Sequence, residues 1–177
     1  MKETVITKTS IFEDYLDKNN LVKMEAVRQF ILNERELFIQ RYDKRYKDFY
    51  LSYNRQIDWI SREVVSKLGA YNNLNVAPIG QKAEVHGFKE STLKRNQINL
   101  YDLAGSPDYT TLFFASASES DQVYIEYSDH RQIEKYMIYN LRPNMYLTFN
   151  SDLNYYFKEK QDSIPRIILT LNYQKVL

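Results

Sequence analysis

Cysteine is absent from the 177-residue sequence, which excludes structural disulfides, thiolate metal sites and thiol nucleophiles. Histidine is nearly absent, because only His86 and His130 occur, so no HExxH motif or other closely paired histidine spacing is present. The four glycines form neither a Walker loop nor a dinucleotide-binding fingerprint, and the sequence has no G-x-S-x-G motif. We therefore expect no catalytic residues, no cofactor and no bound metal ion.

Long apolar runs are also missing, and none approaches the eighteen or so residues needed to cross a bilayer. Residues 1–7 lack the apolar centre of a secretory signal. The formal net charge of +1 provides no field that would attract nucleic acid or an anionic membrane. These absences predict a protein of the cytoplasm or of a virion, without a membrane or nucleic-acid partner.

Glycine and proline do not occur before Gly69. An apolar stripe with 4-4-3 spacing runs through the second half of this stretch, and each of its positions recurs eleven residues later. An eleven-residue repeat corresponds to 3.67 residues per turn, so the stripe would stay on one face of a nearly straight helix. We expect the stripe to form a protein interface, and its members are Phe38, Tyr42, Tyr46, Phe49, Tyr53, Ile57, Ile60, Val64 and Leu68.

The stripe predicts one long helix from Lys23 to Leu68, ended by Gly69 as a left-handed cap. If Asn33–Glu36 is a turn, the same residues would instead form a hairpin of two antiparallel helices. A shorter helix is expected over Ile11–Lys18. Residues 1–69 would then form a helical arm.

Residues 70–177 have a different character, with short segments of alternating apolar and polar residues between turns. Seven strands are expected, at Ala83–Phe88, Gln97–Leu103, Thr111–Ser116, Gln122–Tyr127, Lys135–Leu141, Met145–Phe149 and Arg166–Tyr173. Asp152–Ser163 is expected to be a short helix or a long loop. The predicted fold is therefore α+β, with the helical arm followed by an antiparallel β-sandwich or barrel of about seven strands over 70–177.

Three polar segments contain residue types used in chemistry or binding. Ser128–His130 has the residues of a catalytic triad, but neighbours at a strand end point in different directions, so a polar turn explains the segment. The basic and aromatic stretch Arg41–Lys47 has its tyrosines on the apolar stripe, which favours a solvated helix face over a nucleic-acid contact. An acidic group lacks the regular spacing of a calcium loop, and its members are Glu119, Asp121, Glu126 and Asp129.

Tyrosine is common, with sixteen residues, and its large stiff ring with a polar tip favours protein interfaces. Codon bias explains the count equally well. We predict a non-enzymatic structural protein that assembles with copies of itself and with other proteins, such as a ring, neck or tail protein of a tailed-phage virion. The alternatives are a β-domain that binds a sugar or another small molecule, and a nucleic-acid-binding protein. The tyrosines available for an interface or a sugar site are Tyr124, Tyr127, Tyr136, Tyr139, Tyr146, Tyr155 and Tyr156.

Overall fold

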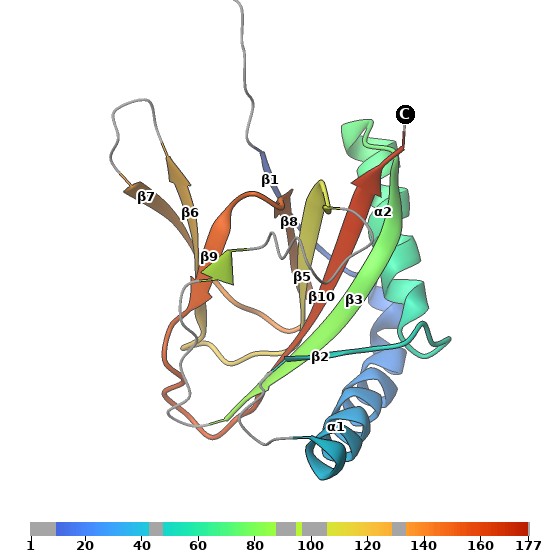
Figure 1. Ribbon diagram of the computed structural model, residues 1–177, viewed down its shortest axis with the longest axis vertical. Coiled ribbons are helices and arrows are strands. Elements are labelled where there is room, and N and C mark those ends of the chain that lie inside the picture. Colours follow the sequence, from blue (N-terminus) through green and yellow to red (C-terminus); the bar gives the residue numbers. More distant parts are fainter. Residues whose placement is uncertain (1–9, 43–47, 88–94, 97–105, 129–133, 177) are drawn as a thin grey trace, which may run out of the picture.

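The computed structural model describes residues 10–42, 48–87, 95–96, 106–128 and 134–176. Within these residues, two antiparallel sheets lie face to face and two helices cover the outer face of one of them (Figure 1). In chain order the elements are β1 (Ile11–Tyr15), η1 (Lys18–Lys23), α1 (Met24–Arg41), β2 (Asp48–Tyr50), α2 (Asp58–Asn72), β3 (Val76–His86), β4 (Arg95–Asn96), β5 (Tyr109–Ser116), β6 (Gln122–Ser128), β7 (Glu134–Asn140), β8 (Met145–Asn150), β9 (Asn154–Phe157) and β10 (Arg166–Lys175).

Successive strands of the chain are distributed between the two sheets in the pattern of a known fold. The major sheet has the strand order β1-β8-β5-β10-β3-β2, and the minor sheet has the order β4-β9-β6-β7. From β3 onwards the chain passes repeatedly between them, so that four of these eight strands lie in each sheet. Eight strands arranged in this way form a jelly roll. β1 and β2, which come from the first 69 residues, add to the two edges of the major sheet by pairing with β8 and β3.

The space between the sheets is filled mainly by apolar side chains. Each strand contributes alternate residues, because successive side chains point to opposite faces; β6 contributes Val123 and Ile125, and β10 contributes Ile168. Leu112, Phe114, Leu147, Phe149, Tyr155 and Phe157 belong to the same buried cluster. Most of the barrel interior is therefore a packed core.

The helices pack on the other face of the major sheet. The buried residues of α1 include Val27 and Ile31, and those of α2 include Ile60, Val64 and Leu68, so each helix buries residues at helical spacing. These side chains share a second core with β-strand residues that include Ala83, Phe113 and Leu169. Arg28 also links α1 to β5, since its Nε donates a hydrogen bond of 2.7 Å to the carbonyl oxygen of Ala115.

The prediction of one long helix, and with it the α+β fold of an arm followed by a β-domain, is wrong. α1 ends at Arg41 and α2 begins at Asp58, and between them β2 pairs with β3 and places Phe49 opposite Ala83. Asn33–Glu36 lies within α1, so the alternative turn at this position is also wrong. A long-range strand pair interrupts the helical pattern because tertiary pairing outweighs local propensity.

The eleven-residue stripe is divided among these elements. Ile57, Ile60, Val64 and Leu68 are buried around α2, and Phe49 is buried on β2, whereas Phe38 is only partly buried. Tyr42 and Tyr53 are 67% and 56% exposed, and Tyr46 lies outside the described residues. The buried members of the stripe therefore pack within the molecule. A contact of the stripe with another protein stays a prediction.

Three further local predictions differ from the structure. Ile11–Lys18 was expected to be helical, but Ile11–Tyr15 is the strand β1, held in the sheet by β8. α2 continues through Gly69 to Asn72, and its C-cap is Asn73, which has the left-handed φ of 53°. The strand β9 lies in the segment expected to be a helix or a loop. The expected strand Gln97–Leu103 lies outside the described residues.

None of the helices in the described part of the chain combines the length and the apolar composition needed to cross a membrane.

Candidate functional site: a buried charged cluster at one end of the barrel

Five titratable side chains are buried together at one end of the space between the sheets. β3 ends with Glu84 and His86, and β10 begins with Arg166, which pairs with His86 across the sheet. Asp121 lies directly before β6, and Lys160 lies in the segment between β9 and β10. Each of the five is at most 1% exposed. Charged residues are rarely buried to this extent unless they are paired, so the cluster needs a specific account.

Asp121 joins the two cations. Its Oδ1 accepts a hydrogen bond of 3.2 Å from Nη1 of Arg166, and its Oδ2 lies 3.3 Å from Nζ of Lys160. The backbone N–H of Ser118 also donates to Oδ2, at 2.9 Å. Two cationic partners and a backbone donor therefore compensate for the water that this buried carboxylate has lost.

Lys160 continues this network towards the surface. Its Nζ donates to Oγ of Ser118 at 3.0 Å and to Oδ1 of Asp162 at 2.5 Å. Ser118 and Ser120 in turn donate to Oδ2 of Asp162, at 2.5 and 2.7 Å. The hydrogen bond from Lys160, followed by those from the two serines, lowers the pKa of Asp162 well below its ordinary value. The network ties the β9–β10 connection to the turn before β6.

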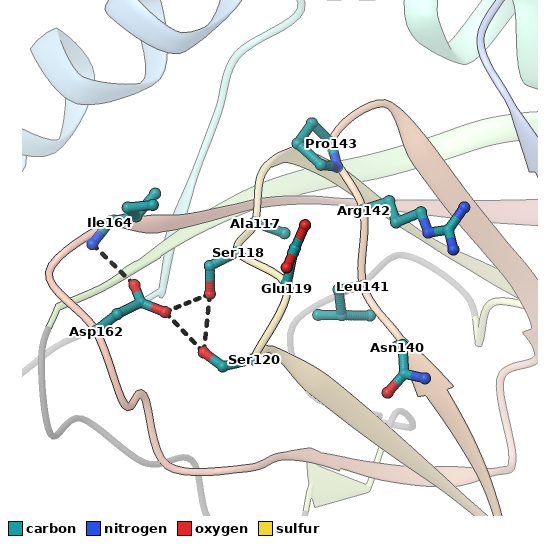
Figure 2. A pocket seen from close by; sticks show the side chains of 10 residues that line it. All are labelled: Ala117, Ser118, Glu119, Ser120, Asn140, Leu141, Arg142, Pro143, Asp162 and Ile164. Carbon is teal, nitrogen blue, oxygen red and sulfur yellow. Dashed lines mark hydrogen bonds between the residues drawn. The ribbon is translucent and has the colours of Figure 1, made fainter.

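The outer side of the network borders an open depression of about 1010 Å³ (Figure 2). Ser118, Ser120 and Asp162 lie together on one wall, and Arg142 and Asn140 come from the opposite side. Both serine hydroxyls already donate to Asp162, so neither is arranged as a nucleophile activated by a base. We interpret this wall as a structural link between two loops.

Arg166 is the unusual member of the cluster, because only one end of its guanidinium is bonded. Nη1 donates to Asp121 and to the carbonyl oxygen of Lys158, whereas Nε and Nη2 are buried and have no hydrogen-bond partner among the described residues. Burial lowers the pKa of Arg166 from its ordinary value, and the neighbouring Asp121 opposes this shift. Arginine nevertheless keeps its charge in proteins. The side of the guanidinium formed by Nε and Nη2 is therefore a charged pair of donors facing the protein interior.

An aromatic ring packs against the face of this guanidinium. Phe157 of β9 lies under Arg166, with 4.8 Å between the guanidinium carbon and the ring centroid, and its ring is 5.9 Å from that of His86. Nε2 of His86 lies 3.0 Å from Oε2 of Glu84. At this end of the barrel, Arg166 of β10 and the His86–Glu84 pair of β3 therefore lie close to Phe157 of β9.

The structure distributes the residues selected from the sequence. Of the acidic group, Asp121 belongs to the buried cluster, Glu119 is exposed, and Glu126 accepts a hydrogen bond from Asn154 on β9. Ser128 ends β6, and Asp129, His130 and Arg131 lie outside the described residues. Arg41 and Tyr42 are exposed at the end of α1, and residues 43–47 lie outside the described residues.

The strand tyrosines are also divided. Tyr146 and Tyr155 are buried, whereas Tyr124, Tyr136 and Tyr156 form a cluster on β6, β7 and β9. Burial, together with the nearby carboxylate of Asp14, raises the pKa of Tyr146 far above its ordinary value.

Sequence reasoning missed Glu84, His86, Lys160 and Arg166. These residues are separated by up to 82 positions, and only the strand order brings them together. One signal was available: on β10, Arg166 is in phase with Ile168, so it occupies an interior position of the barrel. A charged residue at a core position is an exception that points to function or to a buried pair.

No protein-family profile matches the sequence, and a search of curated proteins finds no significant match. Solved structures do match the fold. A Pseudomonas putida prolyl-4-hydroxylase has a TM-score of 0.63 and 6% identity, with 96% of this chain and 94% of that chain covered. HygX from Streptomyces hygroscopicus, solved with nickel and 2-oxoglutarate bound, has a TM-score of 0.58 and 12% identity, covering 93% and 81%. An oxidoreductase of the 2OG-Fe(II) oxygenase family from Burkholderia pseudomallei has a TM-score of 0.63 and 7% identity, covering 94% and 84%.

These matches correct the functional prediction. The expectation of a non-enzymatic structural protein, and of a phage virion component in particular, is wrong, because the structures with this fold are described as hydroxylases and oxygenases. The expectation that the chain is not an enzyme is overturned by the same matches. The low identities extend this likeness to the fold and not to individual residues.

The described residues do not fit the iron centre that this fold implies. Such a centre uses two histidines and one carboxylate with open coordination positions. The chain has only two histidines, and one of them, His130, lies outside the described residues. His86 already pairs with Glu84, and no group of three histidine, cysteine, aspartate or glutamate residues in the described part is arranged to hold a metal ion.

The fold of this chain is therefore the jelly roll found in 2OG-Fe(II) oxygenases, with an arginine and a phenylalanine, and no described metal triad, at the end of its barrel.

Proposed function

We propose that this protein binds a small organic acid of the 2-oxo dicarboxylate class at the interior end of its barrel, with Arg166 as the group that holds a carboxylate. The observation that carries the proposal is the buried Nε and Nη2 pair of Arg166, which has no hydrogen-bond partner among the described residues. An unsatisfied buried donor costs about 1–3 kcal/mol, and more when it is charged. A ligand that accepts from both atoms would remove this cost.

A carboxylate matches this pair of donors. Two neighbouring N–H groups of a guanidinium bind the two oxygens of a carboxylate in a bidentate arrangement. Asp121 already fixes the other end of the guanidinium, and Phe157 supports its face, so the donors are held in place before a ligand arrives. Such preorganisation reduces the entropy lost on binding.

The fold comparison supports the ligand class. HygX, which shares the fold, is described with 2-oxoglutarate bound. A dicarboxylate has one carboxylate for Arg166 and a second polar end. No step through iron is included in the proposal, because the described residues do not assemble its ligands. The proposal places the protein in the cytoplasm, where organic acids of this class are metabolites.

Calorimetric titration of the purified chain with 2-oxoglutarate tests the proposal. We expect saturable binding, and we expect Arg166→Lys to weaken it at least about tenfold, which corresponds to about 1.4 kcal/mol. Lysine keeps a positive charge beside Asp121 but lacks the two coplanar donors. The matched control is Arg142→Lys, an exposed arginine at the depression in Figure 2, which should leave the affinity unchanged.

Two further comparisons sharpen the result. Succinate keeps both carboxylates and lacks the oxo group, so its affinity relative to 2-oxoglutarate reports whether the oxo group is recognised. Each titration is repeated with Ni²⁺ present, and the same affinity is expected because the described residues offer no metal triad. Absence of binding up to about 10 mM, which corresponds to a binding free energy weaker than about 3 kcal/mol, would overturn the proposal.

A further inference from the structure

β7 forms the outer edge of the minor sheet, on the side of the molecule away from the helices (Figure 1). Among the described strands its only neighbour is β6. Three successive large residues on it are exposed: Tyr136 by 40%, Met137 by 44% and Ile138 by 53%. Since successive residues of a strand point to opposite faces, β7 presents apolar surface on both of its faces.

Protein edge strands of this kind are normally protected by proline, bulges, repeated lysines or a covering segment. β7 contains neither proline nor glycine, and it has one lysine, Lys135. Its register with β6 runs from Gln122 opposite Asn140 to Ser128 opposite Glu134 without a shift. A regular apolar edge strand is a template for a further strand.

We propose that β7 pairs with β7 of a second copy of this chain, in an antiparallel arrangement about a two-fold axis, so that two minor sheets join into one. In such an arrangement the central residue faces its own copy, as the symmetry of an isologous interface requires. Centring the pair on Met137 is the register in which all seven residues of Glu134–Asn140 find a partner. It places Tyr136 opposite Ile138 twice and Lys135 opposite Tyr139 twice.

The side chains in this register are compatible with one another. An aromatic residue opposite a β-branched residue is a favourable cross-strand pair, and the register contains two such pairs. Met137 faces its own copy, and methionine adapts to irregular apolar contacts. The lysine faces a tyrosine, and Glu134 falls opposite Asn140, so like charges do not face each other.

Tyr136 is already ordered within one copy. Its ring lies at 6.4 Å from the ring of Tyr124 and 5.8 Å from that of Tyr156, edge-on to both, and those two rings stack at 4.7 Å. A side chain that is held before association loses less entropy when a partner packs against it. Ile138 of the other copy would therefore pack against the cluster formed by Tyr124, Tyr136 and Tyr156.

A second copy suits this edge better than a strongly charged partner. The formal net charge is +1, so two copies scarcely repel each other, and proteins with a net charge near zero tend to associate. The self-complementary register is a property of the strand sequence alone. A single strand pair buries less surface than a standard interface, so we expect a dissociation constant in the micromolar range.

Sedimentation velocity over about 1–500 µM tests the proposal, since this range brackets a micromolar equilibrium. We expect the mass to rise from the 21.2 kDa of one chain to twice that value. Ile138→Glu should keep the protein monomeric over the whole range, because each copy would place a carboxylate against Tyr136 of the other. Ile164→Glu is the matched control, because Ile164 is 52% exposed and lies between β9 and β10, outside β7, so its replacement should leave the dimer intact.

A crosslink reports the register directly. In an antiparallel pair, directly opposite Cα atoms are about 4.5–5.5 Å apart, which lies within the range of a disulfide. The chain has no cysteine, so Met137→Cys introduces the only thiol. Mild oxidation should convert this variant to a covalent dimer, whereas Ile164→Cys, treated identically, should stay monomeric.

Three results would overturn the proposal. The first is a wild-type chain that stays at 21.2 kDa at about 500 µM. The second is a dimer that Ile138→Glu does not dissociate, since the interface would then lie elsewhere. The third is a dimer in which Met137→Cys forms no more crosslink than Ile164→Cys. Thermal melting of all variants checks that each is folded, and none of these results depends on ligand binding at Arg166.

Discussion

Asp121 is the residue on which the charged cluster depends, because it is bonded to both buried cations. Its Oδ1 accepts a hydrogen bond from Arg166 inside the barrel, and its Oδ2 contacts Lys160 in the β9–β10 connection. Removing one partner from a buried ion pair is more costly than replacing the whole pair, because it leaves an uncompensated charge. Changes at single members of the cluster should therefore have large effects on stability.

Lys160→Met should lower the free energy of unfolding by about 3 kcal/mol or more, because it leaves Asp121 and Asp162 without their shared cation. Urea denaturation followed by circular dichroism measures this change. The neighbouring Lys158 is exposed, so Lys158→Met should alter the free energy of unfolding by no more than about 0.5 kcal/mol. Equal effects of the two substitutions would show that the buried network is not formed.

Asp162 should make the stability of the fold depend on pH in the acidic range. Hydrogen bonds from Lys160, Ser118 and Ser120 lower its pKa in the folded state below the ordinary value of 3.8. A carboxylate whose folded pKa is depressed contributes stability above its unfolded pKa, and this contribution is lost as the pH falls through the folded pKa. The connection between β9 and β10 should therefore loosen below about pH 4.

Thermal melting of the wild type and of Asp162→Asn from pH 7 to pH 2 tests this expectation. The wild type should melt at the higher temperature at pH 7, and the difference should shrink below about pH 4. Asp152→Asn, a change at an exposed aspartate, should have little effect at any pH. A difference between wild type and Asp162→Asn that does not vary with pH would contradict the assigned role of the carboxylate.

At the scale of elements, α2 shares with α1 the apolar contact between the helical layer and the major sheet. Val64 is fully buried in this layer, whereas Tyr53, another member of the eleven-residue stripe, is 56% exposed. Val64→Asp should therefore cost about 4 kcal/mol, and Tyr53→Asp about 0.5 kcal/mol, in chemical denaturation. Equal costs at both positions would favour a single continuous buried stripe over the divided one.

The strands were more accessible to sequence reasoning than the helices. The predicted strand segments overlap β5, β6, β7, β8 and β10, because residues that favour strands are bounded there by turn residues. The helical prediction failed where residues distant in the sequence decide the structure. Phe49 fits a helical stripe and equally fits a strand opposite Ala83, and the sheet selects the second.

The charged cluster lies almost entirely beyond sequence reasoning. Only the order of strands in the two sheets brings Glu84, Asp121, Lys160 and Arg166 to one end of the barrel. Among them only Asp121 was considered from the sequence, as one of an acidic group that lacks the spacing of a calcium loop. The in-phase position of Arg166 with Ile168 was the available clue, and it required knowing which face of β10 is interior.

At the scale of the whole molecule, the position of β10 affects how the chain folds during synthesis. β10 is the last of the described strands to leave the ribosome, yet it lies in the middle of the major sheet, between β3 and β5. Until then β3 and β5 lack the neighbour that joins them, and their apolar faces cannot be closed. Pairings between residues far apart in the chain form slowly, so we expect the major sheet to close only after β10 has been synthesised.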